Sequence, residues 1–114
     1  MSEQDRVQLL QGTLDLLVLK TLVFGARHGH GIATNIQQTS DDEILVDHGS
    51  LYPSLQRLER GGLISSKWGV SDNNRRARYY SLTRKGRQRL SDETRKWERM
   101  VRVISRVLEP GEAP

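Results

Sequence analysis

The sequence predicts a mainly α-helical domain of the α+β class, in which a short hairpin lies between two helices. Residues 63–70 and 77–82 are rich in aromatic and branched side chains, as strands are, and the polar segment 71–74 between them has the composition of a turn. Gly61-Gly62 can end the helix before the hairpin, and Thr83 can cap the helix after it. The order helix, strand, arginine-rich turn, strand is typical of a winged helix-turn-helix, here followed by a long C-terminal dimerisation helix.

The first helix is expected to start with Thr13 as its cap and to end near Phe24. It carries two apolar stripes at helical spacing, formed by Leu14, Leu17, Val18 and Leu22 and by Leu16, Leu19 and Val23. A helix that is apolar on two sides is normally buried on both sides. Because so small a domain has little else to cover the second stripe, we expect Leu16 and Leu19 to contact another subunit.

Two further helices are predicted before the hairpin. One covers residues 29–39, and the other starts near Gly49-Ser50. Pro53 falls in the first turn of the second of these, where a missing N–H removes no hydrogen bond. The residues expected to face the core are Ile32, Ala33 and Ile36, followed by Leu51, Leu55 and Leu58 at i, i+4 and i+7.

The final helix is predicted over residues 84–108, before Pro110. Its residues Leu90, Thr94, Trp97, Val101, Ile104 and Leu108 recur at alternating spacings of four and three. This is a heptad seam, and its burial is a gross favourable contribution on the order of 10 kcal/mol. The alternative is packing against the chain's own first helix. A contact between two subunits is favoured, because both helices have more apolar surface than one small domain covers.

Composition limits the class of protein. The chain has 114 residues and a net charge of +4; residues 67–89 hold eight basic residues and one acid, whereas residues 41–47 hold four acids and no base. This separation suits a polyanion bound on one face, although a solvated charged surface is the plainer interpretation. The absence of cysteine excludes disulfides and thiolate metal sites. No apolar run has the length of a membrane span, so a cytoplasmic protein is expected.

Polar side chains on the third helix and at the hairpin tip form a candidate surface for DNA. In a helix-turn-helix the N-terminal residues of the second helix enter the major groove, and a helix N-terminus also offers N–H groups to phosphate. Adjacent arginines at a hairpin tip can reach the DNA backbone or the minor groove. The residues expected to contact DNA are Ser50, Tyr52, Pro53, Ser54 and Arg57 on the helix, Asn73, Asn74, Arg75 and Arg76 at the tip, and Lys85 at the start of the last helix.

Four blocks of the sequence resemble the PadR family of bacterial transcriptional regulators. They occur in family order at 11–19 (QGTLDLLVL), 28–32 (HGHGI), 49–59 (GSLYPSLQRLE) and 78–86 (RYYSLTRKG). The third and fourth blocks together are specific, and the resemblance covers about residues 9–108. The single C-terminal helix is similar to the compact branch of the family. His30 departs from the family pattern, which often has Tyr at that position.

The resemblance implies a homodimeric winged helix that usually acts as a repressor on a palindromic operator. Together with the polar residues at the start and Pro110 near the end, it leads us to expect a flexible N-terminus (1–8), a DNA-binding domain (9–83), a dimerisation helix (84–108) and a flexible tail (109–114). Some compact members of the family bind flat aromatic compounds at the dimer interface, and Trp97 is the candidate for such a small aromatic effector. An interface tryptophan without a ligand is the commoner situation.

No motif supports a catalytic, cofactor or metal site. Gly49-Ser50 lacks the Gly-x-Ser-x-Gly spacing of a nucleophile elbow, and His28 and His30 have no nearby acid or cysteine to complete a set of metal ligands. We therefore expect neither an enzyme nor a cofactor. The main alternative is a winged helix that contacts a protein without specific DNA binding. RNA binding is less favoured, because the sequence offers no platform of stacking aromatic residues.

Overall fold

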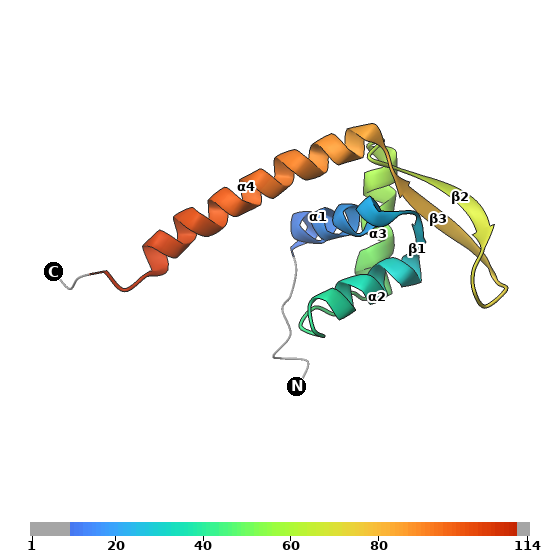
Figure 1. The fold of residues 1–114 in the computed structure, drawn as a ribbon, viewed down its shortest axis with the longest axis horizontal. Helices are drawn as coiled ribbons and strands as arrows, with labels where there is room; N and C mark the ends of the chain where they lie inside the picture. The colour runs from blue at the N-terminus through green and yellow to red at the C-terminus, as the bar shows by residue number, and fades with distance from the viewer. Residues whose placement is uncertain (1–9, 112–114) are drawn as a thin grey trace.

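The computed structural model describes residues 10–111, which fold into helices with a small antiparallel sheet at one edge (Figure 1). The elements are α1 (Gln11–Thr21), the 3-10 helix η2 (Leu22–Phe24), β1 (Arg27–His28), α2 (Gly29–Thr39), α3 (His48–Arg60), β2 (Ile64–Val70), β3 (Arg76–Leu82) and α4 (Arg84–Leu108). This confirms the predicted α+β class. The ends predicted to be flexible at 1–8 and, in part, at 109–114 lie outside the described residues.

The start of α1 differs from the prediction. The helix begins at Gln11 after Leu10, so Thr13 lies inside the first turn and does not cap it. The later helices have caps at the predicted positions or within two residues of them. Thr83 Oγ1 accepts the N–H of Gly86 at 3.0 Å at the start of α4. Asp47, two residues before the predicted start of α3 at Gly49, accepts the N–H of Ser50 at 2.8 Å. Because α3 begins at His48, Pro53 lies in its second turn and not, as predicted, in its first.

The sheet contains one strand that the sequence did not predict. It has the order β1-β3-β2, and Arg27 and His28 of β1 pair with Tyr80 and Tyr79 of β3. Two residues are too few to show the alternation by which strands are recognised in a sequence. His28 also caps α2, because its Nδ1 accepts the N–H of Gly31 at 3.0 Å. The strand therefore fixes the start of α2 against the hairpin.

The core lies between α1, α2, α3 and the inner end of the sheet. The three leucines of α3 predicted to face inward are buried, as are Ile32 and Ile36 of α2. The full set of buried hydrophobic residues is Leu14, Val18, Leu19, Leu22, Ile32, Ile36, Val46, Leu51, Leu55, Leu58, Leu63, Ile64 and Tyr80. Helical periodicity therefore predicted the core faces of α2 and α3 correctly.

Helix α4 extends from this body as an arm (Figure 1). The Cα radius of gyration is 16.4 Å, whereas a compact domain of this size has about 13 Å. Only the first part of the arm packs on the domain, where Leu90 contacts the core beside α1. Within residues 10–111 no helix has the length and apolarity that crossing a membrane requires.

The first turn of α4 approaches the chain that follows α3 very closely. A Cβ built at Gly86 would lie 2.0 Å from the Leu63 carbonyl oxygen and 2.8 Å from Leu82 Cδ1. Real Cβ contacts are never this short, so only glycine fits without moving the backbone. The glycine that weakens a helix in isolation is here what allows α4 to dock on the domain.

Replacement Gly86→Ala should therefore lower the free energy of unfolding by about 1–3 kcal/mol, as overpacking of a tight interior does. Urea denaturation followed by circular dichroism measures this change. Gly12→Ala is the matched control, because a Cβ at Gly12 meets nothing within 4 Å, and alanine in an open helical position should be neutral or slightly stabilising. Equal stability of the two variants would contradict the close approach.

Candidate nucleic-acid interface

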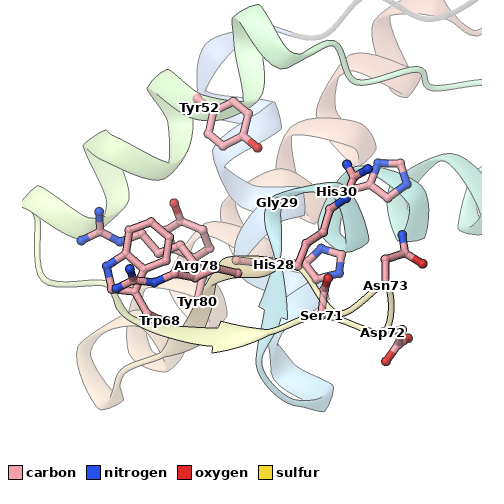
Figure 2. Close-up of a pocket in the computed structure, with 13 residues that line it drawn as sticks. His28, Gly29, His30, Tyr52, Trp68, Ser71, Asp72, Asn73, Arg78 and Tyr80 are labelled. Carbon is pink, nitrogen blue, oxygen red and sulfur yellow. The ribbon is translucent and has the colours of Figure 1, made fainter.

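An open groove runs between the start of α3 and the wing, by which we mean β2, β3 and the turn 71–75 that joins them (Figure 2). Its volume is about 710 Å³. Tyr52 extends toward it from α3, and Trp68, Arg78 and Tyr80 gather on the opposite wall. The remaining lining residues are His28, Gly29, His30, Ser71, Asp72, Asn73, Arg75, Arg76 and Ala77. Three of these thirteen residues are arginines and one is an acid, so the groove is electropositive.

The predicted contact residues at the start of α3 are exposed. Ser50, Tyr52 and Pro53 all lie at the surface. Tyr52 packs edge-on against His48, with ring centroids 5.6 Å apart, and its hydroxyl end lies against the start of α2, where a Cβ at Gly29 would be 3.0 Å from the oxygen. The tyrosine is therefore held in one orientation at the mouth of the groove, between the two helices of the helix-turn-helix.

The predicted residues at the wing tip are also exposed, from Asn73 to Arg76. The turn is closed by a backbone hydrogen bond from the Ser71 N–H to the Arg75 carbonyl at 2.8 Å. Asn74 has a φ of 58°, a left-handed conformation that asparagine tolerates better than most residues. Two adjacent arginines are therefore exposed to solvent at the tip, where a phosphate can reach them.

Ser54 and Arg57 are placed differently from the prediction. The Ser54 side chain is 0% exposed, and its Oγ donates to Asp15 Oδ1 at 2.5 Å. Arg57 binds the same carboxylate with two nitrogens, Nη2 to Oδ1 at 2.9 Å and Nε to Oδ2 at 3.3 Å. The assignment of Ser54 to DNA is corrected, because a carboxylate on α1 engages its buried hydroxyl. The same carboxylate pairs with Arg57, whose side chain is 33% exposed, so a DNA contact by Arg57 stays a prediction.

Lys85 lies at the surface but has an intramolecular partner. Its Nζ donates to the Gly61 carbonyl at 2.9 Å, at the C-terminal end of α3. A lysine is stabilising there, because the end of a helix has unpaired carbonyls and partial negative charge. A phosphate contact by Lys85 would compete with this bond.

Sequence reasoning did not select Trp68, Arg78 and Tyr80 as groove residues. In the hairpin register Trp68 faces Arg78 and Ser66 faces Tyr80, so these side chains share one face. Strand alternation identifies such a face only when the register is known. Burial raises the pKa of Tyr80 above its usual range, Arg78 opposes the rise, and Glu59 and Tyr52 add to it. Tyr80 thus remains a neutral phenol at physiological pH.

The predicted dimer residues fall into two groups. Leu19 is buried in the domain's own core and Leu90 packs against that core, so their assignment to a second subunit is corrected. The second stripe of α1 is covered in part by the first turns of α4, which was the alternative to a contact between subunits. The residues that remain accessible are Leu16, which is half-buried, and Trp97, Val101, Ile104 and Leu108, which are exposed.

The histidines do not belong to a recognisable metal site. His28 accepts a backbone N–H, and His30 stacks beside it with ring centroids 6.3 Å apart. Across residues 10–111 no three or more His, Cys, Asp or Glu side chains are grouped closely enough to hold a metal ion.

Several known proteins are similar to this chain. The family model described as the transcriptional regulator PadR-like family matches residues 18–92. An uncharacterized protein of Lysinibacillus sphaericus is 29% identical over 105 residues, which cover 91% of this chain and 95% of that protein. A transcriptional regulator of Mycobacterium tuberculosis is 38% identical over 68 residues, which cover 60% of this chain and 63% of that protein. The structure of a transcriptional regulator from Clostridium thermocellum matches with a TM-score of 0.80 and 28% identity, covering 87% of this chain and 96% of that one.

The role of Asp15 can be tested by stability. Asp15→Ala removes the acceptor of the buried Ser54 hydroxyl and the partner of Arg57, and it should lower the free energy of unfolding by about 1–3 kcal/mol. Asp92→Ala is the control: it breaks the pair with Arg95 on the exposed face of α4, which should cost less than about 1 kcal/mol. A decrease for Asp15→Ala no larger than that of the control would argue against the network.

Proposed function

Because this chain belongs to the PadR-like family of transcriptional regulators, we propose that it binds an inverted-repeat operator in double-stranded DNA as a homodimer and represses transcription. Members of the family are regulators, not enzymes, and DNA binding follows from that membership. The observation that carries the proposal is that the exposed N-terminal end of α3 and the arginines of the wing border one groove. Binding to chromosomal DNA would place the protein in the cytoplasm.

The proposed contacts are of two kinds: contacts to base edges, which recognise the sequence, and contacts to the DNA backbone, which position the protein. Ser50, Tyr52 and Pro53 lie in the first two turns of α3, which is the element that enters the major groove in a helix-turn-helix. Arg75 and Arg76 would contact the sugar–phosphate backbone or the minor groove beside it, which fixes the register of the protein on the duplex. Such phosphate contacts supply affinity for any sequence, and the contacts of α3 supply preference for the operator.

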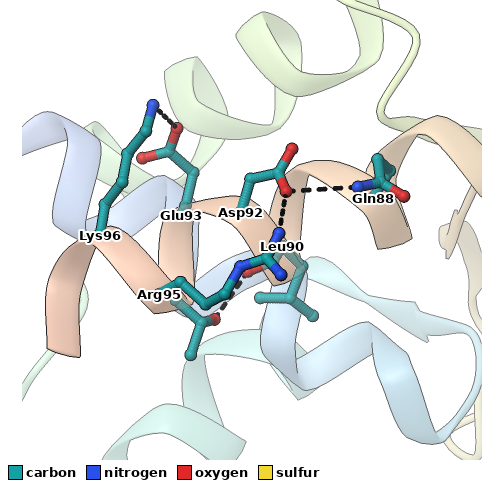
Figure 3. A network of polar contacts seen from close by, with 7 residues as sticks. Gln88, Leu90, Asp92, Glu93, Arg95 and Lys96 are labelled. Atoms are coloured by element: carbon teal, nitrogen blue, oxygen red, sulfur yellow. Dashed lines mark hydrogen bonds and ion pairs between the residues drawn. The ribbon is translucent and has the colours of Figure 1, made fainter. Parts of the chain in front are cut away.

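The homodimer is supported by the apolar side of α4. Seven side chains there are between 45% and 79% exposed in the single chain: Trp97, Met100, Val101, Val103, Ile104, Val107 and Leu108. The opposite side of the helix carries polar residues such as Arg95, which pairs with Asp92 at 2.6 Å (Figure 3). A helix with one polar and one uncovered apolar side is stable when a partner covers the apolar side.

A dimer through α4 and the accessible part of α1, including Leu16, would present two reading helices to one face of the duplex. Half-sites should then lie about one helical turn apart, roughly 34–36 Å. An effector that alters the angle between the subunits would change this separation and release the DNA. Trp97, half-exposed in the single chain, is the proposed contact for a small aromatic effector, with the second subunit closing the site.

DNA binding should depend steeply on salt. If the dimer neutralises about eight phosphates, log K against log salt has a slope of about −7, measured by fluorescence anisotropy with DNA from upstream of the protein's own gene. Arg75→Ala and Arg76→Ala should weaken binding to all sequences and flatten the slope by about 0.9 for each phosphate that the variant no longer neutralises. Arg95→Ala, which removes an equal charge from α4, should change neither the affinity for DNA nor the slope of log K against log salt. Unchanged affinity of the wing variants would remove the wing from the interface, and a shallow slope without an operator would indicate a protein-contact module.

The role of α4 is tested by a charge in the seam. Val101→Glu places a carboxylate where the second helix is proposed to pack, and it should convert the dimer to a monomer in size-exclusion chromatography with light scattering. Arg102→Ala changes the net charge by the same amount at a position outside the seam, and it should leave the mass unchanged. A Val101→Glu protein that stays dimeric would show that the subunits meet elsewhere than along α4.

A further inference from the structure

Trp68 is the largest side chain on the wing, and it is 57% exposed. It lies on β2 and lines the groove on the side opposite Tyr52 (Figure 2). An indole offers much apolar surface, and the face of its ring attracts cations. Its aromatic face is occupied within the described chain by cations.

The hairpin register brings two arginines onto the indole. Trp68 pairs with Arg78 across the strands, and Arg76 lies two residues away from Arg78 on the same face of β3. The guanidinium carbon of Arg76 is 4.6 Å from the centroid of the ring, and that of Arg78 is 5.8 Å from it. Both distances lie within the range of about 6 Å in which the face of an indole attracts a cation.

The two arginines differ in their other contacts. Arg78 Nε donates to Ser66 Oγ at 2.8 Å, and its Nη2 lies 3.8 Å from a carboxylate oxygen of Glu59 on α3. Ser66 Oγ in turn donates to that carboxylate at 2.5 Å. Arg76 forms no ion pair within residues 10–111. Arg78 is therefore anchored to α3 with its charge balanced, whereas the charge of Arg76 is available to a polyanion.

We propose that Trp68 is a positioning residue for DNA binding, which holds the Arg76 guanidinium in the orientation that a phosphate of the duplex requires. This inference rests on the proposed function. A free arginine loses side-chain entropy when it binds a phosphate, and an indole that already restrains it removes part of that loss. Through Arg78 and Glu59 the same indole is connected to α3, so that the wing's phosphate contact keeps a constant position relative to the reading helix.

The experiment is a double-mutant cycle in the full-length protein, with a fluorescein-labelled duplex from upstream of its own gene as the probe. The variants are Trp68→Leu, Arg76→Ala and the pair. Leucine keeps an apolar side chain on the strand but removes the ring face. Trp68→Phe keeps a smaller ring face and is the conservative rescue. Phe24→Leu is the matched control, because it removes another exposed ring that lies under a cation, that of Lys20, but outside the groove. Circular dichroism melting establishes that each variant is folded.

Trp68→Leu should weaken binding by about two- to fivefold, the fold-change expected for an exposed cation–π contact, and Trp68→Phe should restore much of that affinity. In the Arg76→Ala background the same substitution should have almost no effect, because the guanidinium it positions is gone. Two results would overturn the inference while the proposed function stands: equal effects of Trp68→Leu with and without Arg76, or a weakening by Trp68→Leu no larger than that by Phe24→Leu. A wild-type protein that binds no duplex would overturn both. If Trp68→Leu melts below the assay temperature, the cycle is repeated with Trp68→Phe. The test is then whether the loss of affinity caused by Trp68→Phe disappears in the Arg76→Ala background.

Discussion

The direction in which α4 leaves the domain depends on one close approach between its first turn and the chain that follows α3. At Gly86 the backbone lies where a Cβ would be 2.0 Å from the Leu63 carbonyl oxygen. Thr83 and Lys85 complete the junction by donating to the carbonyls of Gly62 and Gly61, which end α3. The wing begins at Ile64, directly after Leu63. The reading helix, the wing and the arm are therefore positioned by the same few atoms, and any pairing of subunits through α4 inherits their relative orientation.

A second constraint is polar and lies beneath the proposed reading surface. Asp15 on α1 accepts hydrogen bonds from Ser54 and Arg57 on α3. Ser54 is fully buried, and a buried polar group without a partner is costly, so these hydrogen bonds help to fix the rotation of α3 about its axis. That rotation decides which side of α3 is solvated. Ser50, Tyr52 and Pro53 are at the surface because Ser54 and Arg57 are turned toward α1.

The charge pattern of the groove follows from how its cations are partnered. Arg78 is balanced by Glu59, and Lys85 is bound to the end of α3, whereas the arginines at the tip lie exposed on a turn closed by backbone bonds. Arg75 and Arg76 have no ion pair within residues 10–111, and they lie at the outer end of the wing, where a duplex lying across the start of α3 would present its backbone. Net charge over residues 67–89 could not distinguish the cations used inside the protein from those left for a partner.

Much of this architecture was determined by local sequence. The bounds of α2 and α4, the core face of α3 and the turn of the wing follow from helical period, caps and turn residues, which act over a few positions and are read directly from the chain. Tertiary structure alone decided the strand Arg27–His28, the burial of Leu19, the engagement of Arg57 by Asp15 and the arginines on Trp68. Each of these features depends on contacts between separate elements of the chain. A sequence pattern specifies which face of its element a side chain occupies, but it does not specify which residues lie opposite that face.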